Sequence, residues 1–535
     1  MKEKNKLALL ALASSILASC GGGNSGGSSQ LNLYLYKGGF GTEWLSSIIE
    51  SFESDETIKD KFGDVTVKIA TINASDDYAT SSLEGLSNKY DIYFGMNLQK
   101  YIGKKGANKK LLLEDLTDLY DAQVPGEDTT LKEKMLDSAR STNEISDAAG
   151  NISYYTLPWS GGYNGIMYNP DILSSYNIDV PVTTDELVNA AKKITLESDD
   201  HYSIIQGCSS PDSCYWTYLY PTWWAQYEGY EQYINFWHGK LSSDAKDYSD
   251  INIFKQQGRL ASLTVLENLF ADYTVDDTKY NNLVKTAESK EYMTAQKEFF
   301  QGKGAFMACG DWYHNEMANF IEQAKAAGQE IHNVRMMRTP VHSSIISRLE
   351  TINDDATLSK VIKAVDEGKT SYEGVSDKDF ASVVEARQML YSTGNYHTAV
   401  IPTVSAKKDL AKAFLSYLAT DKANDIYIRK TGGSCMFFKY DIKNLNPSLY
   451  ASLNDTSKMM MDLYNNEVHA PILLPIPNNF RIFREGGVSL LNANSTADFE
   501  VSFRSGMTAE KYYEDDINYW TEAMWQAMKR KLGVK

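Results

Sequence analysis

The sequence has few residues that bind transition metals and a shortage of positive charge. Its 535 residues include only 7 His and 5 Cys. They contain no CxxC pair, no HExxH motif and no close His/Cys cluster, so we expect no metal site and no cofactor. Lys and Arg number 53 against 70 Asp and Glu, giving a net charge of -17. This acidic balance argues against a nucleic-acid partner, whose binding rests on a basic stripe.

Long hydrophobic runs are also absent, except at the N-terminus. Lys2, Lys4 and Lys6 precede an apolar stretch from Leu7 to Ala18 that ends at small residues. This pattern predicts a secretory signal peptide over residues 1–19, which is too short to span a bilayer permanently.

The end of the signal peptide carries a candidate lipidation site. Leu17-Ala18-Ser19-Cys20 resembles the lipobox of bacterial lipoproteins, whose cysteine receives a diacylglycerol; the alternative is an ordinary signal peptide with an incidental cysteine. Residues 20–30, rich in Gly and Ser, predict a flexible tether. Without the signal peptide the net charge becomes -19, so we expect the lipid on Cys20, rather than basic patches, to hold the protein to the membrane.

Two of the remaining cysteines could form a disulfide in an exported protein. Cys208 and Cys214 are separated by Ser-Ser-Pro-Asp-Ser and could close a short loop. Cys309 and Cys435 are expected to be buried small hydrophobic residues.

The first part of the mature chain alternates strands with helices. Residues 31–36, 65–69 and 90–94 have strand patterns, and Thr42 is positioned to cap a helix with one apolar face. That face comprises Trp44, Leu45, Ile48, Ile49 and Phe52. The alternation predicts an α/β fold with a mostly parallel sheet, in which ligands bind beyond the carboxyl ends of the strands.

Further elements follow along the chain. Strands are expected over residues 165–168 and within 302–312, and Thr183 with Glu186 forms a capping box that opens a helix. Residues 358–365, 380–391 and 410–418 read as helices, and a final helix carries Trp520, Met524, Trp525 and Met528.

Taken in order, these blocks resemble the extracellular solute-binding proteins of carbohydrate ABC importers, the family that includes maltose-binding protein. The resemblance rests on the lipobox, residues 31–54, the YDIYF strand, residues 157–169, the Pro-x-Thr-x-x-Glu-Leu helix start, residues 302–312 and Ser405-Ala406-Lys407-Lys408. It implies a periplasmic-binding-protein-like α/β fold of two lobes, with an interlobe ligand cleft and a hinge that the chain crosses three times. Lobe 1 would comprise residues 31–158 and 337–425, with an insertion at about 343–395, and lobe 2 residues 163–333 and 430–535.

The abundance of Tyr and Trp, 35 and 9 residues, fits a sugar ligand, because flat rings with polar edges match the faces and hydroxyls of a sugar. The expected ligand-binding residues stand in loops or beside the hinge: Phe40, Glu43, Asn97, Trp159, Tyr163, Trp223, Trp224, Asp311 and Trp312. Tyr396 and His397 are weaker candidates, whereas Trp44 is expected in the core.

The resemblance further implies a monomeric, non-enzymatic protein that captures a sugar or oligosaccharide on the outer face of the cell membrane. Gly161 and Gly162 would let the hinge close, and the loaded protein would deliver its ligand to an ABC permease. Two alternatives stay open: a binding protein for a peptide or an anion, and a secreted glycoside hydrolase, for which Glu43 and Asp311 would have to face each other across a cleft.

Overall fold

The computed structural model describes residues 29–74, 76–87, 89–146, 151–209, 215–466 and 468–534. The predicted signal peptide, Cys20 and most of the tether lie outside the described residues, and so does Cys214, the expected partner of Cys208. Within these ranges, no helix has the length and apolar character needed to cross a membrane.

The first sheet combines two distant stretches of chain. Its strand order is β2 (Thr66–Asn73), β1 (Gln30–Tyr36), β3 (Ile92–Met96), β14 (His397–Val400) and β6 (Leu157–Pro158). The first three strands are parallel, and β14 runs antiparallel to both β3 and β6. The helices of this lobe are α1 (Glu43–Ser54), α2 (Glu56–Phe62), α3 (Asp76–Glu84), α4 (Thr117–Asp121), α5 (Leu131–Lys134), α6 (Asp137–Thr142), α16 (Lys408–Tyr417) and α17 (Asp421–Lys430).

Helix α1 has the buried face that its apolar spacing predicts. Trp44, Leu45, Ile48, Ile49 and Phe52 are all buried, and α1 packs beside α17. Burial of this face, rather than its N-cap, stabilises the helix, since Thr42 occupies the N-cap position without a side-chain hydrogen bond.

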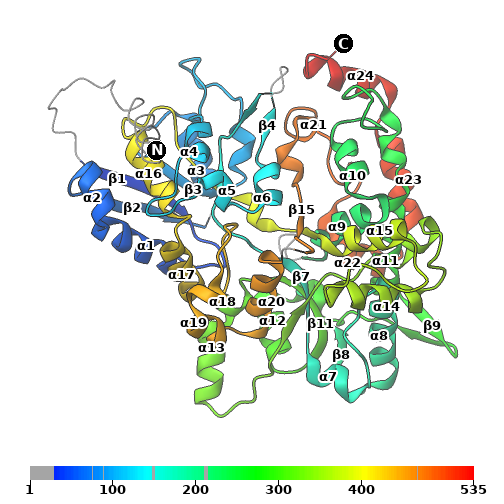
Figure 1. The fold of residues 1–535 in the computed structure, drawn as a ribbon. Helices are drawn as coiled ribbons and strands as arrows, with labels where there is room; N and C mark the ends of the chain where they lie inside the picture. Colours follow the sequence, from blue (N-terminus) through cyan, green and yellow to red (C-terminus); the bar gives the residue numbers. More distant parts are fainter. Residues whose placement is uncertain are drawn as a thin grey trace, which may run out of the picture.

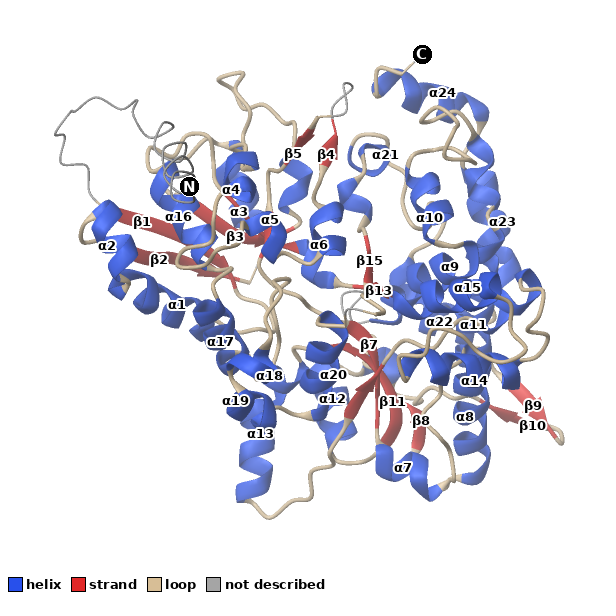
Figure 2. Ribbon diagram, viewed as in Figure 1, coloured by secondary structure: helices blue, strands red, loops and turns tan. Residues whose placement is uncertain are grey.

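The second sheet has the order β12 (Arg335–Met337), β7 (Asn164–Tyr168), β11 (Gly304–Gly310) and β8 (Tyr202–Ile204). Every residue of β11 is buried, as expected for a short apolar strand in the middle of a covered sheet. Figures 1 and 2 show the two sheets in separate parts of the molecule, each with its own helices. The helices around the second sheet are α7 (Pro170–Ser175), α8 (Thr184–Glu197), α9 (Leu219–Glu228), α10 (Tyr230–Trp237), α11 (Gln257–Phe270), α12 (Tyr292–Phe300) and α13 (Tyr313–Ala326).

The segment expected as an insertion in the first lobe packs on the second lobe instead. Met337 pairs with Ile166 in the second sheet, and the chain continues into α14 (Asp355–Asp366) and α15 (Asp377–Gln388), the latter in contact with α9. The apolar side chains of this segment form a small core that includes Val182. The helix expected over residues 380–391 ends at Gln388, because residues 389–391 form strand β13 (Met389–Tyr391), which pairs with β15 (Ile472–Leu474).

The C-terminal segment, residues 430–535, packs against both lobes. Helices α22 (Phe499–Arg504) and α23 (Ala509–Tyr519) pack on α11, as expected for lobe 2. Residues 437 and 439 instead hydrogen-bond to the backbone of residues 136 and 134 in lobe 1. The final helix α24 (Glu522–Lys531) begins after Trp520, which ends α23. The remaining helices are α18 (Ile442–Leu445), α19 (Pro447–Ser452), α20 (Asp455–Tyr464) and α21 (Arg481–Arg484).

Three chain segments, around Gly161, Ser392 and Cys435, lie against one another where the lobes join, and we call them the hinge. The Gly161 N–H donates to Cys435 O at 2.7 Å, and the Ser392 hydroxyl donates to Gly162 O. A Cβ on Gly161 would lie 2.9 Å from Cys435 O, and one on Gly394 would overlap Ser160 O. Glycine is therefore required at both positions by the close approach of the backbones.

Candidate functional site

The loops that follow β1 and β11 touch each other between the two sheets. A Cβ on Gly39 would lie 2.5 Å from Cδ1 of Trp312, so the backbone of one lobe rests on a side chain of the other. Asn315 Nδ2 donates to Gly39 O at 2.5 Å across the same contact. Both loops follow the carboxyl ends of their strands, where α/β proteins place their ligands.

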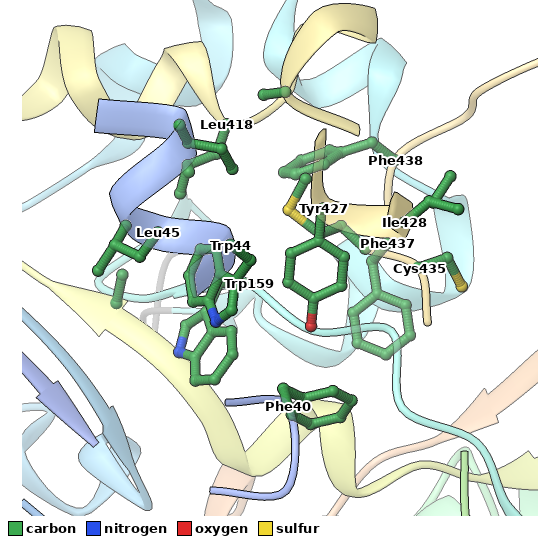
Figure 3. Packing of buried hydrophobic residues seen from close by; sticks show 14 of the residues in the cluster. Phe40, Trp44, Leu45, Trp159, Leu418, Tyr427, Ile428, Cys435, Phe437 and Phe438 are labelled. Atoms are coloured by element: carbon green, nitrogen blue, oxygen red, sulfur yellow. The ribbon is translucent and has the colours of Figure 1, made fainter. Parts of the chain in front are cut away.

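Phe40 is the centre of a group of rings at this contact, which we call the Phe40 cluster. Its centroid lies 5.3 Å from that of His397, 5.9 Å from Trp312 and 6.0 Å from Trp159, each nearly edge to face, and 6.4 Å from Tyr427. Figure 3 shows Phe40, Trp159 and Tyr427 converging from separate segments. The cluster thus joins the loop after β1, the residue after β6, the residue that precedes α13, β14 and α17, with Trp312 only 7% exposed.

Trp159 is held on one side and carries an unused polar group. Its ring stacks on Trp44 at a centroid distance of 5.0 Å and an interplanar angle of 17°. Trp44 is fully buried, as expected for a core residue. The indole Nε1 atoms of Trp159 and of its stacking partner Trp44 are both buried with no acceptor among the described residues.

Asp311 lies beside the cluster and is linked to the backbone of Tyr163 by two hydrogen bonds, one through its side chain and one through its own backbone. Tyr163 N donates to Asp311 Oδ1 at 3.1 Å, and Asp311 N donates to Tyr163 O at 3.0 Å. Burial raises the pKa of Asp311 to about 7, although the Ser434 side chain and the Tyr163 N–H favour the ionised form. Within the described part of the chain, Asp311 Oδ2 has no hydrogen-bond partner.

Tyr163 is buried in the hinge, where its hydroxyl holds the backbone. Tyr163 Oη donates to Met337 O at 3.2 Å and accepts from Thr339 N at 3.0 Å. The structure therefore gives Tyr163 a positioning role, since both functions of the hydroxyl are occupied by the protein.

Glu316 lies at the same contact but was not among the residues expected there. It lies one helical turn after Trp312, and a Cβ on Gly39 would be 2.9 Å from its Oε1. Gln296 Nε2 donates to its Oε2 at 2.9 Å, and burial raises its pKa to about 7. Because residues i and i+4 share one face of a helix, the spacing of Glu316 from Trp312 could have predicted that both side chains lie at this contact.

The cluster is close to electrically neutral. Burial lowers the pKa of His397 to about 4, so its imidazole is uncharged at neutral pH. The two nearby carboxyl groups, Asp311 and Glu316, have raised pKa values. Neither Lys nor Arg occurs among the cluster residues and polar neighbours named above.

Three of the expected site residues lie elsewhere. Glu43 has 81% of its side chain exposed and lies 3.9 Å from Lys430. Trp223 and Trp224 are fully buried within α9 and donate to Pro340 O and Gln256 Oε1. They belong to the core of the second lobe, because α9 is covered by neighbouring helices on every face that carries them.

Asn97 lies at the carboxyl end of β3, next to the strand partner of His397. It adopts a left-handed conformation with φ of 56°, and its N–H donates to Tyr396 O. Its Oδ1 is buried with no partner in the described ranges, so it is a third unused polar group near the cluster.

Two adjoining cavities of about 370 and 380 Å³ run along β12, sharing Tyr168, Val180 and Arg335. No member of the Phe40 cluster lines either of them. They are therefore separate from the contact between the lobes.

Comparison with known proteins identifies the family. A family model of bacterial extracellular solute-binding proteins matches residues 46–332. The chain belongs to this family. The predicted family and the two-lobe α/β fold are both confirmed.

Solved structures of similar solute-binding proteins cover nearly the whole chain. The receptor AcbH, described as having an exclusive preference for β-D-galactopyranose, is 13% identical with a TM-score of 0.54 over 94% of this chain and 99% of its own. RafE from Streptococcus pneumoniae is 14% identical, with a TM-score of 0.53 over 94% and 100%. The GacH receptor of Streptomyces glaucescens is 14% identical, with a TM-score of 0.52 over 95% and 100%. At these identities the likeness shows the fold. No curated protein sequence matches this solute-binding protein.

Proposed function

We propose that this solute-binding protein captures a neutral sugar or oligosaccharide between its lobes and delivers it to an ABC permease. In this proposal Cys20 carries a lipid that anchors the protein to the outer face of the cell membrane, and the protein acts as a monomer. AcbH binds a sugar, and RafE and GacH have been solved with raffinose and acarbose, so the neighbours favour a carbohydrate.

The observation that carries the proposal is the combination of rings and unused polar atoms at the interlobe contact. Phe40, Trp159 and Trp312 are packed against one another here, and separation of the lobes would expose their apolar faces to a sugar ring. Trp159 Nε1, Asp311 Oδ2 and Asn97 Oδ1 provide one donor and two acceptors that the described protein leaves without partners. Sugar hydroxyls can donate and accept, so they are suited to satisfy all three.

Capture would proceed by closure of the lobes. A ligand that touches both Phe40 and Trp312 stabilises the closed state by its greater affinity for that state. The segments around Gly161, Ser392 and Ser434 would absorb the rotation. The permease would then recognise the closed arrangement of the two lobes.

A thermal-shift screen over mono- and oligosaccharides tests the proposal, because a ligand that binds the folded state raises the Tm. We expect a concentration-dependent rise with at least one carbohydrate and its loss in Trp312→Ala. Trp520→Ala is the matched control, since Trp520 is 8% exposed but lies in the C-terminal helical region. No response to any carbohydrate, or equal loss in both variants, would contradict the proposal.

An anion or peptide ligand is disfavoured by the lack of Lys and Arg in the site. Lys37, the cation closest in sequence to Phe40, is exposed. Binding of a panel of dipeptides or organic anions, with no response to sugars, would favour this alternative.

The geometry also argues against glycoside hydrolysis. A hydrolase needs two carboxyl groups whose pKa values are driven apart, one to act as acid and one to stay ionised. Here burial raises the pKa of both Asp311 and Glu316 to about 7, and Glu43 is exposed on the surface. Release of reducing ends from an oligosaccharide would overturn this assignment.

A further inference from the structure

An unusual concentration of positive charge lies in the first lobe. Residues 100–110, which we call the basic loop, contain five Lys and no Asp or Glu. They are Lys100, Lys104, Lys105, Lys109 and Lys110. This local charge of +5 stands out in a chain whose net charge is -17.

The lysines of the basic loop are available to a partner. Lys104, Lys105, Lys109 and Lys110 are exposed, while Lys100 is partly buried. The structure records no ion pair between any of these lysines and an acidic side chain in the described ranges. Lys100 and Lys104 instead extend over the ring of Tyr101, with their Nζ atoms 5.4 and 5.1 Å from its centroid.

The loop is held in one shape by its own backbone. Lys105 forms a bridge with Leu111, and the Gly106 N–H donates to Lys110 O at 2.9 Å. Lys109 adopts φ of 63°, a left-handed conformation that favours Gly or Asn, yet the position carries Lys.

The basic loop lies at the end of the first sheet where the tether enters. Leu112 and Leu113, directly after the loop, pair with Thr403 and Pro402. That segment continues to Ser405, whose hydroxyl donates to Asp91 Oδ1 at 2.8 Å.

Asp91 lies directly before the amino end of β3 and close to the amino end of β1. Its N–H donates to Asn32 O at 2.7 Å, and Lys407 Nζ donates to Gln30 O, the first residue of β1. The basic loop and Gln30 therefore share the end of the lobe that is opposite the Phe40 cluster.

We propose that the basic loop binds the anionic headgroups of the phospholipid surface to which the protein is tethered. This inference rests on the lipidation of Cys20 in the proposed function. A tether of residues 20–30 reaches about 36 Å at most, so it keeps Gln30 and the loop close to the lipid surface. Exposed lysines are attracted by anionic headgroups within a Debye length, while the acidic remainder of the protein is repelled, so the loop orients the protein on the membrane.

Vesicle co-sedimentation of the mature chain, residues 20–535 with Cys20→Ser so that no lipid is attached, tests the loop directly. We expect binding to phosphatidylglycerol vesicles at about 0.05 M salt to be about tenfold stronger than to phosphatidylcholine vesicles, and to disappear at about 0.5 M salt. The quadruple variant Lys104→Gln, Lys105→Gln, Lys109→Gln and Lys110→Gln should lose this preference.

A matched control carries Lys246→Gln, Lys285→Gln, Lys325→Gln and Lys360→Gln. These four lysines are exposed and lie outside the basic loop, so the change in net charge is identical. The control should keep the preference for phosphatidylglycerol. Equal losses in both variants, equal binding to the two kinds of vesicle, or loop-dependent binding to a single-stranded oligonucleotide in place of vesicles would overturn the proposal.

Two further measurements separate this inference from the proposed function. The loop variant should keep the sugar-induced rise in Tm, because the loop is remote from the Phe40 cluster. Mass spectrometry of the N-terminal peptide from native membranes tests the lipid on Cys20 independently of the loop.

Discussion

Asp311 is a carboxyl group whose burial makes the stability of the protein depend on pH. Its pKa is raised from 3.8 to about 7 by burial, so the folded state keeps a proton that the unfolded chain releases. The free energy of unfolding therefore falls as the pH rises from about 4 to about 7, and this contribution is constant above that window. The folded protein therefore loses stability at neutral pH because it buries a carboxyl group whose Oδ2 has no partner among the described residues of the interlobe contact.

Replacing Asp311 should remove this dependence. Relative to the wild type, Asp311→Asn should gain free energy of unfolding as the pH rises from about 4 to about 7, by up to about 4 kcal/mol. Denaturant unfolding of both proteins at several pH values measures the difference. Glu316 titrates in both proteins, so its contribution cancels in the difference between them. Curves of unfolding free energy against pH that run parallel across this range would show that Asp311 does not have a raised pKa.

Four of the residues expected at the site lie together in the structure, although their binding of a ligand stays a prediction. Phe40, Trp159, Asp311 and Trp312 follow or precede strands, and the structure brings them together. Trp223 and Trp224 were chosen for residue type, but they lie on a helix that is buried all round. Composition identifies aromatic residues without saying which of them face the other lobe.

At the scale of elements, the capping box of α8 ties two segments together. Thr183 Oγ1 accepts from Glu186 N at 3.2 Å, as the sequence predicts, and also donates to Asp355 Oδ2 at 2.7 Å. The first bond begins α8, and the second fixes the start of α14 against it.

Thr183→Ala should therefore destabilise the protein more than loss of a cap alone. We expect a decrease of about 2 kcal/mol in the free energy of unfolding, against about 1 kcal/mol for Thr508→Ala. Thr508 is a suitable control because it caps α23 through Lys511 N, and within the part of the chain that the structure describes it is bound to no second segment. Equal losses in denaturant unfolding would show that the bond to Asp355 contributes nothing measurable.

Element boundaries were predictable where local signals are strong. The buried face of α1, the capping box of α8 and the buried strand β11 all follow from spacing along the chain. The end of α15 at Gln388 was not predictable, because residues 389–391 form a strand only through pairing with residues 472–474. That partner is some 80 residues further along the chain.

At the scale of the whole molecule, the contact of Gly39 with Trp312 determines how closely the lobes approach. Gly39→Ala would place a Cβ 2.5 Å from the Trp312 ring and 2.9 Å from Glu316 Oε1. The lobes would have to separate, so we expect a larger radius of gyration in small-angle scattering and weaker binding of any sugar that raises the Tm.

Gly95→Ala provides the comparison for this prediction. Its Cβ would approach Leu98 of the same lobe at 3.1 Å, which perturbs the first lobe without touching the second. An unchanged radius of gyration and unchanged sugar affinity in Gly39→Ala would show that the observed contact does not limit closure.

The sequence by itself determined the local elements, the α/β class and the family, because each depends on signals from residues near one another in the chain. Tertiary structure decided which of the 9 Trp residues share the interlobe contact and which fill a core. It also decided that residues 343–395 pack on the second lobe rather than the first. The reason is that these outcomes depend on contacts between residues tens to hundreds of positions apart, such as Gly39 with Trp312 and Thr183 with Asp355, and the local pattern at either residue does not specify its partner.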